Sequence, residues 1–302
     1  MSTPPAPTPS APRTSTSTSS SSSPSLLPIP PVLRRLFDAF PLLTYPPAAL
    51  PARSPDLTSS PLPRLYVFAA PDSEGRDAPS FNPSCLKWQA YLKFCGVEYT
   101  NVPSSNHASP SGQLPFLLPA ASAGGSAGAV GKALPARQLL SWAGPQSGCD
   151  LQAPEVAAVM ELVDSRVRDA WLYALHLSPL HFPLAQSLYC HTAVPLVNAL
   201  LSRRMRSSAA AELARTRSGV LTADEVYADA DAAWAALEEI LGGDEWFFGA
   251  QAPGLVDAAV FAYTHLVLGV RWDGAEAGVV TRLRACKALV GHEKRVRAVC
   301  GW

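Results

Sequence analysis

The chain has 302 residues, of which 16% are charged, and its formal net charge at neutral pH is zero. This length supports one or two domains with sizeable hydrophobic cores, and the balanced charge argues against a nucleic-acid binder that relies on a net positive field. The six cysteines include no CxxC pair and no zinc-type spacing, which indicates free thiols in a reducing compartment.

The N-terminal part of the chain begins with a low-complexity segment of Ser, Thr and Pro at residues 1–31. Such a segment cannot bury enough apolar surface to offset its ordering entropy, so we predict a disordered tail. Residues 32–63 are predicted to be a short amphipathic helix and a proline-rich connector. The apolar face of this helix contains the candidate partner-docking residues, Leu33, Leu36, Phe37 and Phe40. The face either packs on the protein's own body or docks on a partner or a membrane surface.

Residues 64–144 have the element order of a thioredoxin-like α/β domain. The predicted elements are a strand at 64–70, a helix at 82–95, a strand at 97–104, a turn and strand at 112–119, and a short strand and helix within 131–144. Asn82 is the predicted N-cap of the first helix, with Pro83 in its first turn and Gly96 after its end. The small-residue segment 120–131 is predicted to be a flexible surface loop.

Cys85 lies in the first turn of that predicted helix, where a helix N-terminus stabilises a thiolate. It also starts a helical stripe that continues through Trp88, Leu92 and Cys95, and free cysteines are among the residues most often buried. We therefore predict that Cys85 is a core residue. A reactive thiol is the alternative.

Residues 145–302 have the pattern of an all-helical domain after a hinge-like segment. Two apolar stripes predict buried helix faces, one of Val156, Val159, Met160, Val163, Val167 and Trp171, the other of Val226, Ala230, Trp234, Leu237 and Leu241. Thr222 and Glu225 form a capping box before the second stripe. The apolar run 255–270 contains Asp257 and His265 and is shorter than the roughly 20 residues of a membrane span, so we expect a core helix.

Two basic clusters lie in this half, at Arg203, Arg204 and Arg206 and at Lys294, Arg295 and Arg297. We predict solvated helix faces. Contact with anionic lipid headgroups or with an acidic partner is the alternative.

Two passages resemble glutathione-transferase-fold proteins. "SGQLPFLLP" resembles the loop and strand of the N-terminal domain in which the proline is in cis, so we expect a cis Leu114–Pro115 bond. "FFGAQAPGLVDAAVFAY" resembles the start of a helix in the C-terminal domain, where Asp257 would cap the first-turn amides and Gly254 would be the N-cap. The resemblance covers roughly residues 64–300. It implies a thioredoxin-like α/β N-terminal domain followed by an all-α C-terminal domain.

The same resemblance allows the enzyme chemistry to be tested residue by residue. The family's spacing puts the nucleophile position at Asn82, and an amide is not a nucleophile. The pair that binds the γ-glutamyl group aligns with Pro135 and Ala136, which lack the amide donor and the hydroxyl. The histidines show no ligand spacing. We therefore expect no catalytic residue, no cofactor and no metal, with Pro115 and Asp257 retained as structural residues.

Residues 82–119 and the preceding 33–47 are similar to metaxins and their fungal counterparts in the mitochondrial sorting and assembly machinery. The likeness is to the smaller subunit, because the chain ends in "RAVCGW" without an apolar anchor. It implies a peripheral protein on the cytosolic face of the outer membrane. The implied partners are the β-barrel channel subunit, the larger metaxin-like subunit and β-barrel precursor proteins. The alternatives are a glutathione-dependent transferase or peroxidase with an atypical site, and a soluble protein of the same fold with another binding role.

Overall fold

The computed structural model describes residues 61–70, 77–120, 132–144, 153–190, 194–217 and 222–302, with the single residues 31, 35, 73 and 192. The chain divides into two units, Met1–Ala48 and Ala49–Trp302, and the described elements below belong to the second. The predicted docking residues Leu33, Leu36, Phe37 and Phe40 lie outside the described residues. So do the predicted tail and nearly all of the predicted loop 120–131. No helix in the described ranges is long and apolar enough to cross a membrane.

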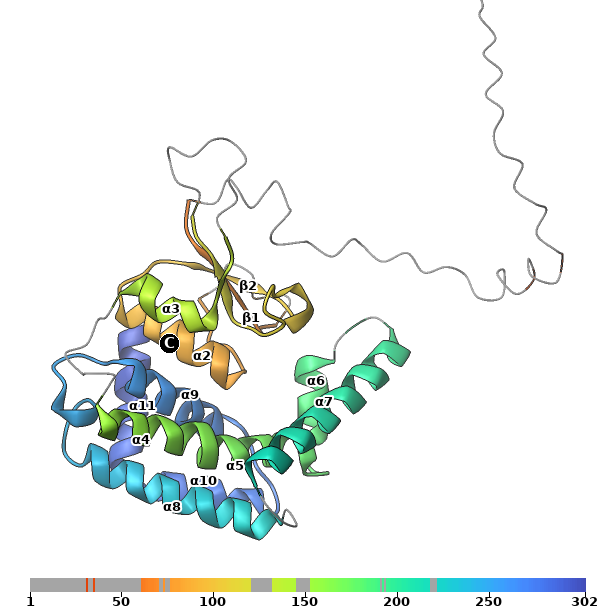
Figure 1. Ribbon diagram of the computed structural model, residues 1–302. Coiled ribbons are helices and arrows are strands. Elements are labelled where there is room, and N and C mark those ends of the chain that lie inside the picture. The colour runs from red at the N-terminus through yellow and green to blue at the C-terminus, as the bar shows by residue number, and fades with distance from the viewer. Residues whose placement is uncertain are drawn as a thin grey trace, which may run out of the picture. The chain divides into compact units, whose positions relative to one another are not determined.

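The N-terminal half contains a four-stranded sheet in the order β2-β1-β3-β4. Its elements are β1 Arg64–Val67, α2 Pro83–Phe94, β2 Thr100–Pro103, the short helix η3 Asn106–Ala108, β3 Phe116–Leu118, β4 Leu134–Pro135 and α3 Ala136–Ala143. β1 pairs in parallel with β2 and antiparallel with β3, which pairs antiparallel with β4. The predicted order of elements is confirmed, and the strands are shorter than predicted. Figure 1 shows α2 and α3 between the sheet and the helices α9 and α11.

The C-terminal half is helical, as predicted. Its helices are α4 Pro154–Leu162, α5 Arg168–Leu172, α6 Phe182–Tyr189, α7 Pro195–Thr216, α8 Ala223–Leu241, α9 Leu255–Gly269, α10 Glu276–Ala285 and α11 Lys287–Cys300, with the wide-turn segments η4 Val163–Val167 and η5 Tyr173–Leu177 and the short helix η6 Phe247–Gly249. The two predicted stripes are buried, except that Met160 is only partly buried. Most of both faces belongs to one core, to which α9, α10 and α11 also contribute, whereas Val226 and Ala230 belong to a smaller cluster with Ala170 and Ala174.

The sheet domain and the helical domain share a second core. Cys85 and Leu92 of α2 belong to the same buried cluster as Ala258 and Phe261 of α9 and Val296 of α11. Because α9 is apolar on nearly all sides, it can face both cores at once. The position of α2, and therefore of the residues at its start, is set by helices from the other half of the chain.

The two residues predicted to be structural occupy the expected places. The Leu114–Pro115 peptide bond is cis. Gly254 is the N-cap of α9, and the Asp257 carboxylate accepts hydrogen bonds from the backbone N–H of Gly254 at 2.8 Å and of Phe247 at 3.1 Å. The capped amides are therefore that of the N-cap itself and one in the preceding η6, rather than those of the first turn. The same carboxylate contacts His292 Nε2 of α11 at 2.9 Å.

Candidate functional site

The start of α2 is the position at which this fold would place reactive chemistry, and Asn82 occupies it. Its backbone is extended, and its Oδ1 accepts the Cys85 N–H at 3.2 Å, which makes it the helix N-cap as predicted. Its Nδ2 donates to the hydroxyl of Tyr189, at the end of α6, at 3.1 Å. Both polar groups of the amide are therefore used within the protein.

Cys85 lies beneath this position and is fully buried. Burial raises the pKa of its thiol to about 12, although hydrogen bonds involving the Phe68 backbone and the Ser80 side chain act in the opposite direction. A reactive cysteine needs a lowered pKa and access to a second reactant. The prediction that Cys85 is a core residue is confirmed. Of the predicted stripe, Trp88 and Leu92 are also buried, whereas Cys95 is only half-buried because it is the C-cap residue.

An aromatic cluster covers the start of α2. The ring of Tyr189 makes edge-to-face contacts with Phe68 after β1, at 5.0 Å between centroids, and with Phe81, at 5.1 Å. His176 of η5 lies 5.9 Å from the same tyrosine ring, and burial lowers the pKa of this histidine to about 4, so its side chain is neutral at pH 7. Rings from the two halves of the chain therefore pack beside Asn82.

A buried polar network holds the loop that leads into α2. The Ser80 hydroxyl donates to the Phe68 carbonyl and accepts the Asn82 N–H at 3.1 Å. Gln89 of α2 accepts the Ser80 N–H at 2.8 Å and donates to Asn101 Oδ1 of β2 at 2.9 Å. Because these bonds join the loop to β1, β2 and α2, they hold the backbone of the loop in place.

The two other segments that would complete a glutathione site offer few donors. The N–H of Leu114, just before the cis proline, donates to Asn106 Oδ1 at 2.9 Å. Pro135 is the N-cap of α3 and makes no side-chain cap, and Ala136 follows it as the first helical residue. A proline has no N–H and an alanine has no polar side chain.

A separate apolar cavity lies within the helical half. It is lined by Trp171, Trp234 and Trp272 together with Glu276. The Glu276 carboxylate accepts a hydrogen bond from the Tyr227 hydroxyl at 2.8 Å. Within the described residues, no group of three or more His, Cys, Asp or Glu side chains could hold a metal ion.

Comparison with known families decides the fold. Residues 83–181 match the glutathione S-transferase N-terminal domain, and residues 230–296 match the glutathione S-transferase C-terminal domain. The chain has a glutathione-transferase-like fold. Residues 182–229, which contain α6 and α7, lie between the two matched ranges.

Several solved structures are similar to this glutathione-transferase-like chain. A glutathione transferase family member from Pseudomonas fluorescens, with two glutathione bound, is 15% identical, with 82% of this chain and 91% of that chain covered and a TM-score of 0.44. A glutathione S-transferase of Ceriporiopsis subvermispora in complex with glutathione is 16% identical, with 77% and 97% covered and a TM-score of 0.47. FzlA from C. crescentus is 14% identical, with 79% and 89% covered and a TM-score of 0.45. A search of curated proteins finds no match.

The glutathione-transferase-like site contains residues that sequence reasoning missed. Tyr189 and His176 come from the helical half, and Tyr189 is 107 residues from the asparagine that it contacts. No local pattern links the two segments, and only the packing of α6 near the start of α2 brings them together. Asn82 and Cys85 could be predicted because a helix start has a local signature.

Proposed function

We propose that the protein is a non-catalytic, metaxin-like subunit of the mitochondrial outer-membrane sorting and assembly machinery. It binds as a peripheral protein on the cytosolic face, docks on the β-barrel channel subunit beside the larger metaxin-like subunit, and helps to recognise and insert β-barrel precursors. The similarity of residues 33–47 and 82–119 to metaxins supports the identity of the subunit.

The observation that carries the proposal is the state of the α2 start. Asn82 has no nucleophile to offer, and both of its side-chain polar groups are engaged. Cys85 is buried with a raised pKa. Pro135 and Ala136 occupy the places where the γ-glutamyl group would be bound, and each lost hydrogen bond to a charged group costs about 1.5–3 kcal/mol. These features favour a scaffold over a transferase.

The second candidate is a glutathione-dependent transferase or peroxidase with an atypical site. Matches to both glutathione S-transferase domains favour it. Calorimetric titration with glutathione separates the two candidates. We expect no saturable binding below millimolar concentrations and no thiol-transfer turnover. Turnover that is abolished by Cys85→Ser would establish the enzyme instead.

Affinity purification tests the complex directly. The tagged chain is isolated from mitochondrial membranes in a mild detergent, and its partners are identified by mass. We expect an outer-membrane β-barrel protein and a second metaxin-like chain in comparable amounts. Recovery of the chain alone, or only as a dimer of itself, would contradict the proposed function.

A further inference from the structure

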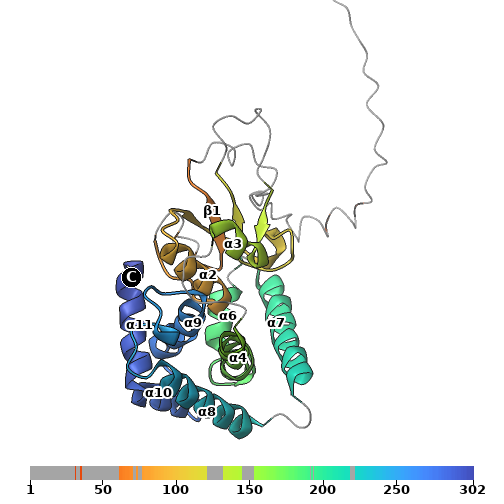
Figure 2. The ribbon, with the colours of Figure 1, turned by 60° about the vertical axis from the view of Figure 1, so that its left-hand side comes forward.

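The segment between the two matched domains forms a helical hairpin of α6 and α7. Figure 1 shows the first half of α7 lying away from helices α8–α11, while its second half returns to α5, and Figure 2 shows the same helix at the edge of the helical half. This helix pair lies outside both matched ranges.

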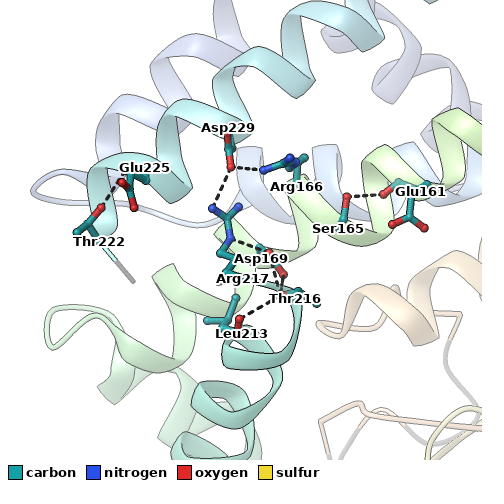
Figure 3. Close-up of polar contacts among 10 residues, drawn as sticks. All are labelled: Glu161, Ser165, Arg166, Asp169, Leu213, Thr216, Arg217, Thr222, Glu225 and Asp229. Atoms are coloured by element: carbon teal, nitrogen blue, oxygen red, sulfur yellow. Dashed lines mark hydrogen bonds and ion pairs between the residues drawn. The ribbon is translucent and has the colours of Figure 1, made fainter. Parts of the chain in front are cut away.

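The C-terminal end of α7 is firmly anchored. Arg217 lies just after the helix. Its Nε is 2.9 Å from the buried carboxylate of Asp169, and its Nη1 is 2.9 Å from the partly exposed carboxylate of Asp229. Arg166 pairs with the same Asp229, and the Thr216 hydroxyl lies within hydrogen-bond distance of Asp169. Figure 3 shows these side chains converging from α7, α8 and the η4–α5 segment. The direction of α7 is therefore set by this end.

The N-terminal end of α7 has the opposite character. Leu196 is 70% exposed, Leu200 is 61% exposed and Val197 is 39% exposed. The spacing of the two leucines, four residues apart, puts them on one face, and the buried side of the helix, at Ser202 and Leu213, faces away from them. Single exposed apolar side chains are normal, but three within two turns form a patch that indicates an interaction surface.

The next turn of the same surface is positively charged. Arg203 and Arg204 are exposed, whereas Arg206 donates to the Leu177 carbonyl at 3.2 Å and lies over the ring of Phe182. The single acidic residue of α7, Glu212, pairs with Arg168 of α5 on the inner side. The outer face of α7 therefore combines apolar and cationic groups without a carboxylate.

The other basic cluster is arranged differently. Arg295 donates to the backbone carbonyls of Asp244 and Glu245 and lies over the ring of Trp246, and Arg297 lies 3.8 Å from Glu293. Arg295 is therefore used to join α11 to the segment after α8, whereas Lys294 and Arg297 are exposed. The cluster on α7 differs in that its exposed arginines follow three exposed apolar side chains on the same helix.

We propose that the start of α7 inserts into the surface of an anionic membrane, with Leu196, Val197 and Leu200 at the acyl boundary and Arg203 and Arg204 at the lipid phosphates. The order along the helix favours a bilayer over an acidic protein. When α7 enters by its N-terminal end, a rise of about 1.5 Å per residue puts the arginines roughly 5–12 Å farther from the acyl chains than the apolar residues, on the side of the lipid headgroups. This inference goes beyond the proposed function, because it requires no partner protein.

Co-sedimentation of the full chain with vesicles tests the inference. The vesicles contain phosphatidylcholine alone or with about 30% phosphatidylserine. We expect binding only to the anionic vesicles and its loss at about 1 M salt, where the Debye length is about 3 Å. Arg203→Gln with Arg204→Gln should weaken binding about 10- to 30-fold, and Leu196→Ser with Leu200→Ser should weaken it at least as much.

Matched variants control for charge, apolarity and folding. Arg284→Gln with Lys287→Gln removes two exposed charges on α10 and α11, and Ile240→Ser with Val299→Ser removes two exposed apolar side chains elsewhere. Both should bind like the original chain, and circular dichroism should show unchanged folding for all variants. Binding to neutral vesicles that equals binding to anionic vesicles would overturn the inference. So would a result in which vesicle binding is lost in the Leu36→Asp with Phe37→Asp variant and in no α7 variant. The inference would also be overturned if the Arg203 and Arg204 substitutions weakened binding to an acidic protein but left vesicle binding unchanged.

Discussion

Two opposing effects act on Cys85, and their relative size decides its chemistry. The N-terminus of a helix stabilises a thiolate, and in accessible sites it contributes to pKa values several units below normal. Complete burial removes the thiolate from water and has the opposite sign. Burial is the larger effect here, since the pKa rises to about 12. The same position along a helix can therefore hold a nucleophile in one chain and a packing residue in another.

Alkylation of the folded protein checks this prediction for Cys85. A pKa of about 12 leaves on the order of one thiol in 100,000 ionised at pH 7, and at pH 9 still only about one in 1,000. Among the cysteines that the structure describes, we expect Cys95 and Cys190, which are half-buried, to react with iodoacetamide first. Cys85 should be labelled only after denaturation, as measured by peptide mass spectrometry. Labelling of Cys85 in the folded chain at the rate of a free thiol would contradict the prediction.

The Asn82–Tyr189 contact should couple the two halves of the chain energetically. Asn82→Ala removes the helix cap and should lower the free energy of unfolding by about 0.5–2 kcal/mol. Tyr189→Phe removes the hydroxyl that accepts this hydrogen bond and should lower the free energy of unfolding by about 0.5–1.5 kcal/mol. The loss of unfolding free energy in the double variant should be smaller than the sum of the two single losses by roughly 0.5–1.5 kcal/mol. Urea unfolding of all three variants measures this difference, and strict additivity would show that the bond contributes nothing.

Among the elements, α9 has the central role because it packs against both cores. Its first turn depends on Asp257, whose carboxylate is buried and shared among two backbone amides and His292. This single side chain fixes the start of α9 to η6 and to α11. The glycine at the N-cap supplies no side-chain oxygen, so the cap is made from within the helix.

Replacing Asp257 should therefore destabilise the whole helical half. Asp257→Ala leaves two buried N–H donors and His292 without their acceptor, and we expect a loss of about 3 kcal/mol or more. Asp273→Ala, in an exposed loop, is the matched control and should change stability by less than about 0.5 kcal/mol. Thermal and urea unfolding measure both. Equal stability of the two variants would mean that the Asp257 bonds are replaceable.

For the molecule as a whole, the shared core of α2, α9 and α11 makes the sheet domain dependent on the helical domain. The predicted docking helix at residues 32–40 belongs to the other unit of the chain. The proposed function gives docking through this segment a direct test.

Leu36→Asp with Phe37→Asp should release the protein from its complex while the melting temperature stays unchanged. When the complex forms, a carboxylate on an apolar docking face loses its water without gaining a hydrogen-bonding or cationic group, and this cost opposes binding. Arg34→Asp with Arg35→Asp adds the same groups on the opposite face of the predicted helix and should retain assembly. Native electrophoresis of detergent extracts measures the complex. If both double variants formed the full complex, the prediction of docking through this segment would be wrong.

The sequence alone determined those features that depend on neighbouring residues. The start of α2 at Asn82, its end before Gly96, the place of Pro115 and the buried stripe of α8 follow from caps, a proline motif and helical spacing, all of which act within a few turns. From these the α/β and all-α halves could be assembled in the correct order.

The tertiary structure decided what depends on distant segments. It placed Tyr189 against Asn82, buried Cys85 beneath α9, and left Leu196 and Leu200 exposed although their residue type favours burial. Burial is a property of which elements pack together, and it sets both the pKa of a thiol and the contacts that a leucine can make. Packing across more than 100 residues leaves no local mark in the sequence, which is why these contacts and exposures became visible only in the folded chain.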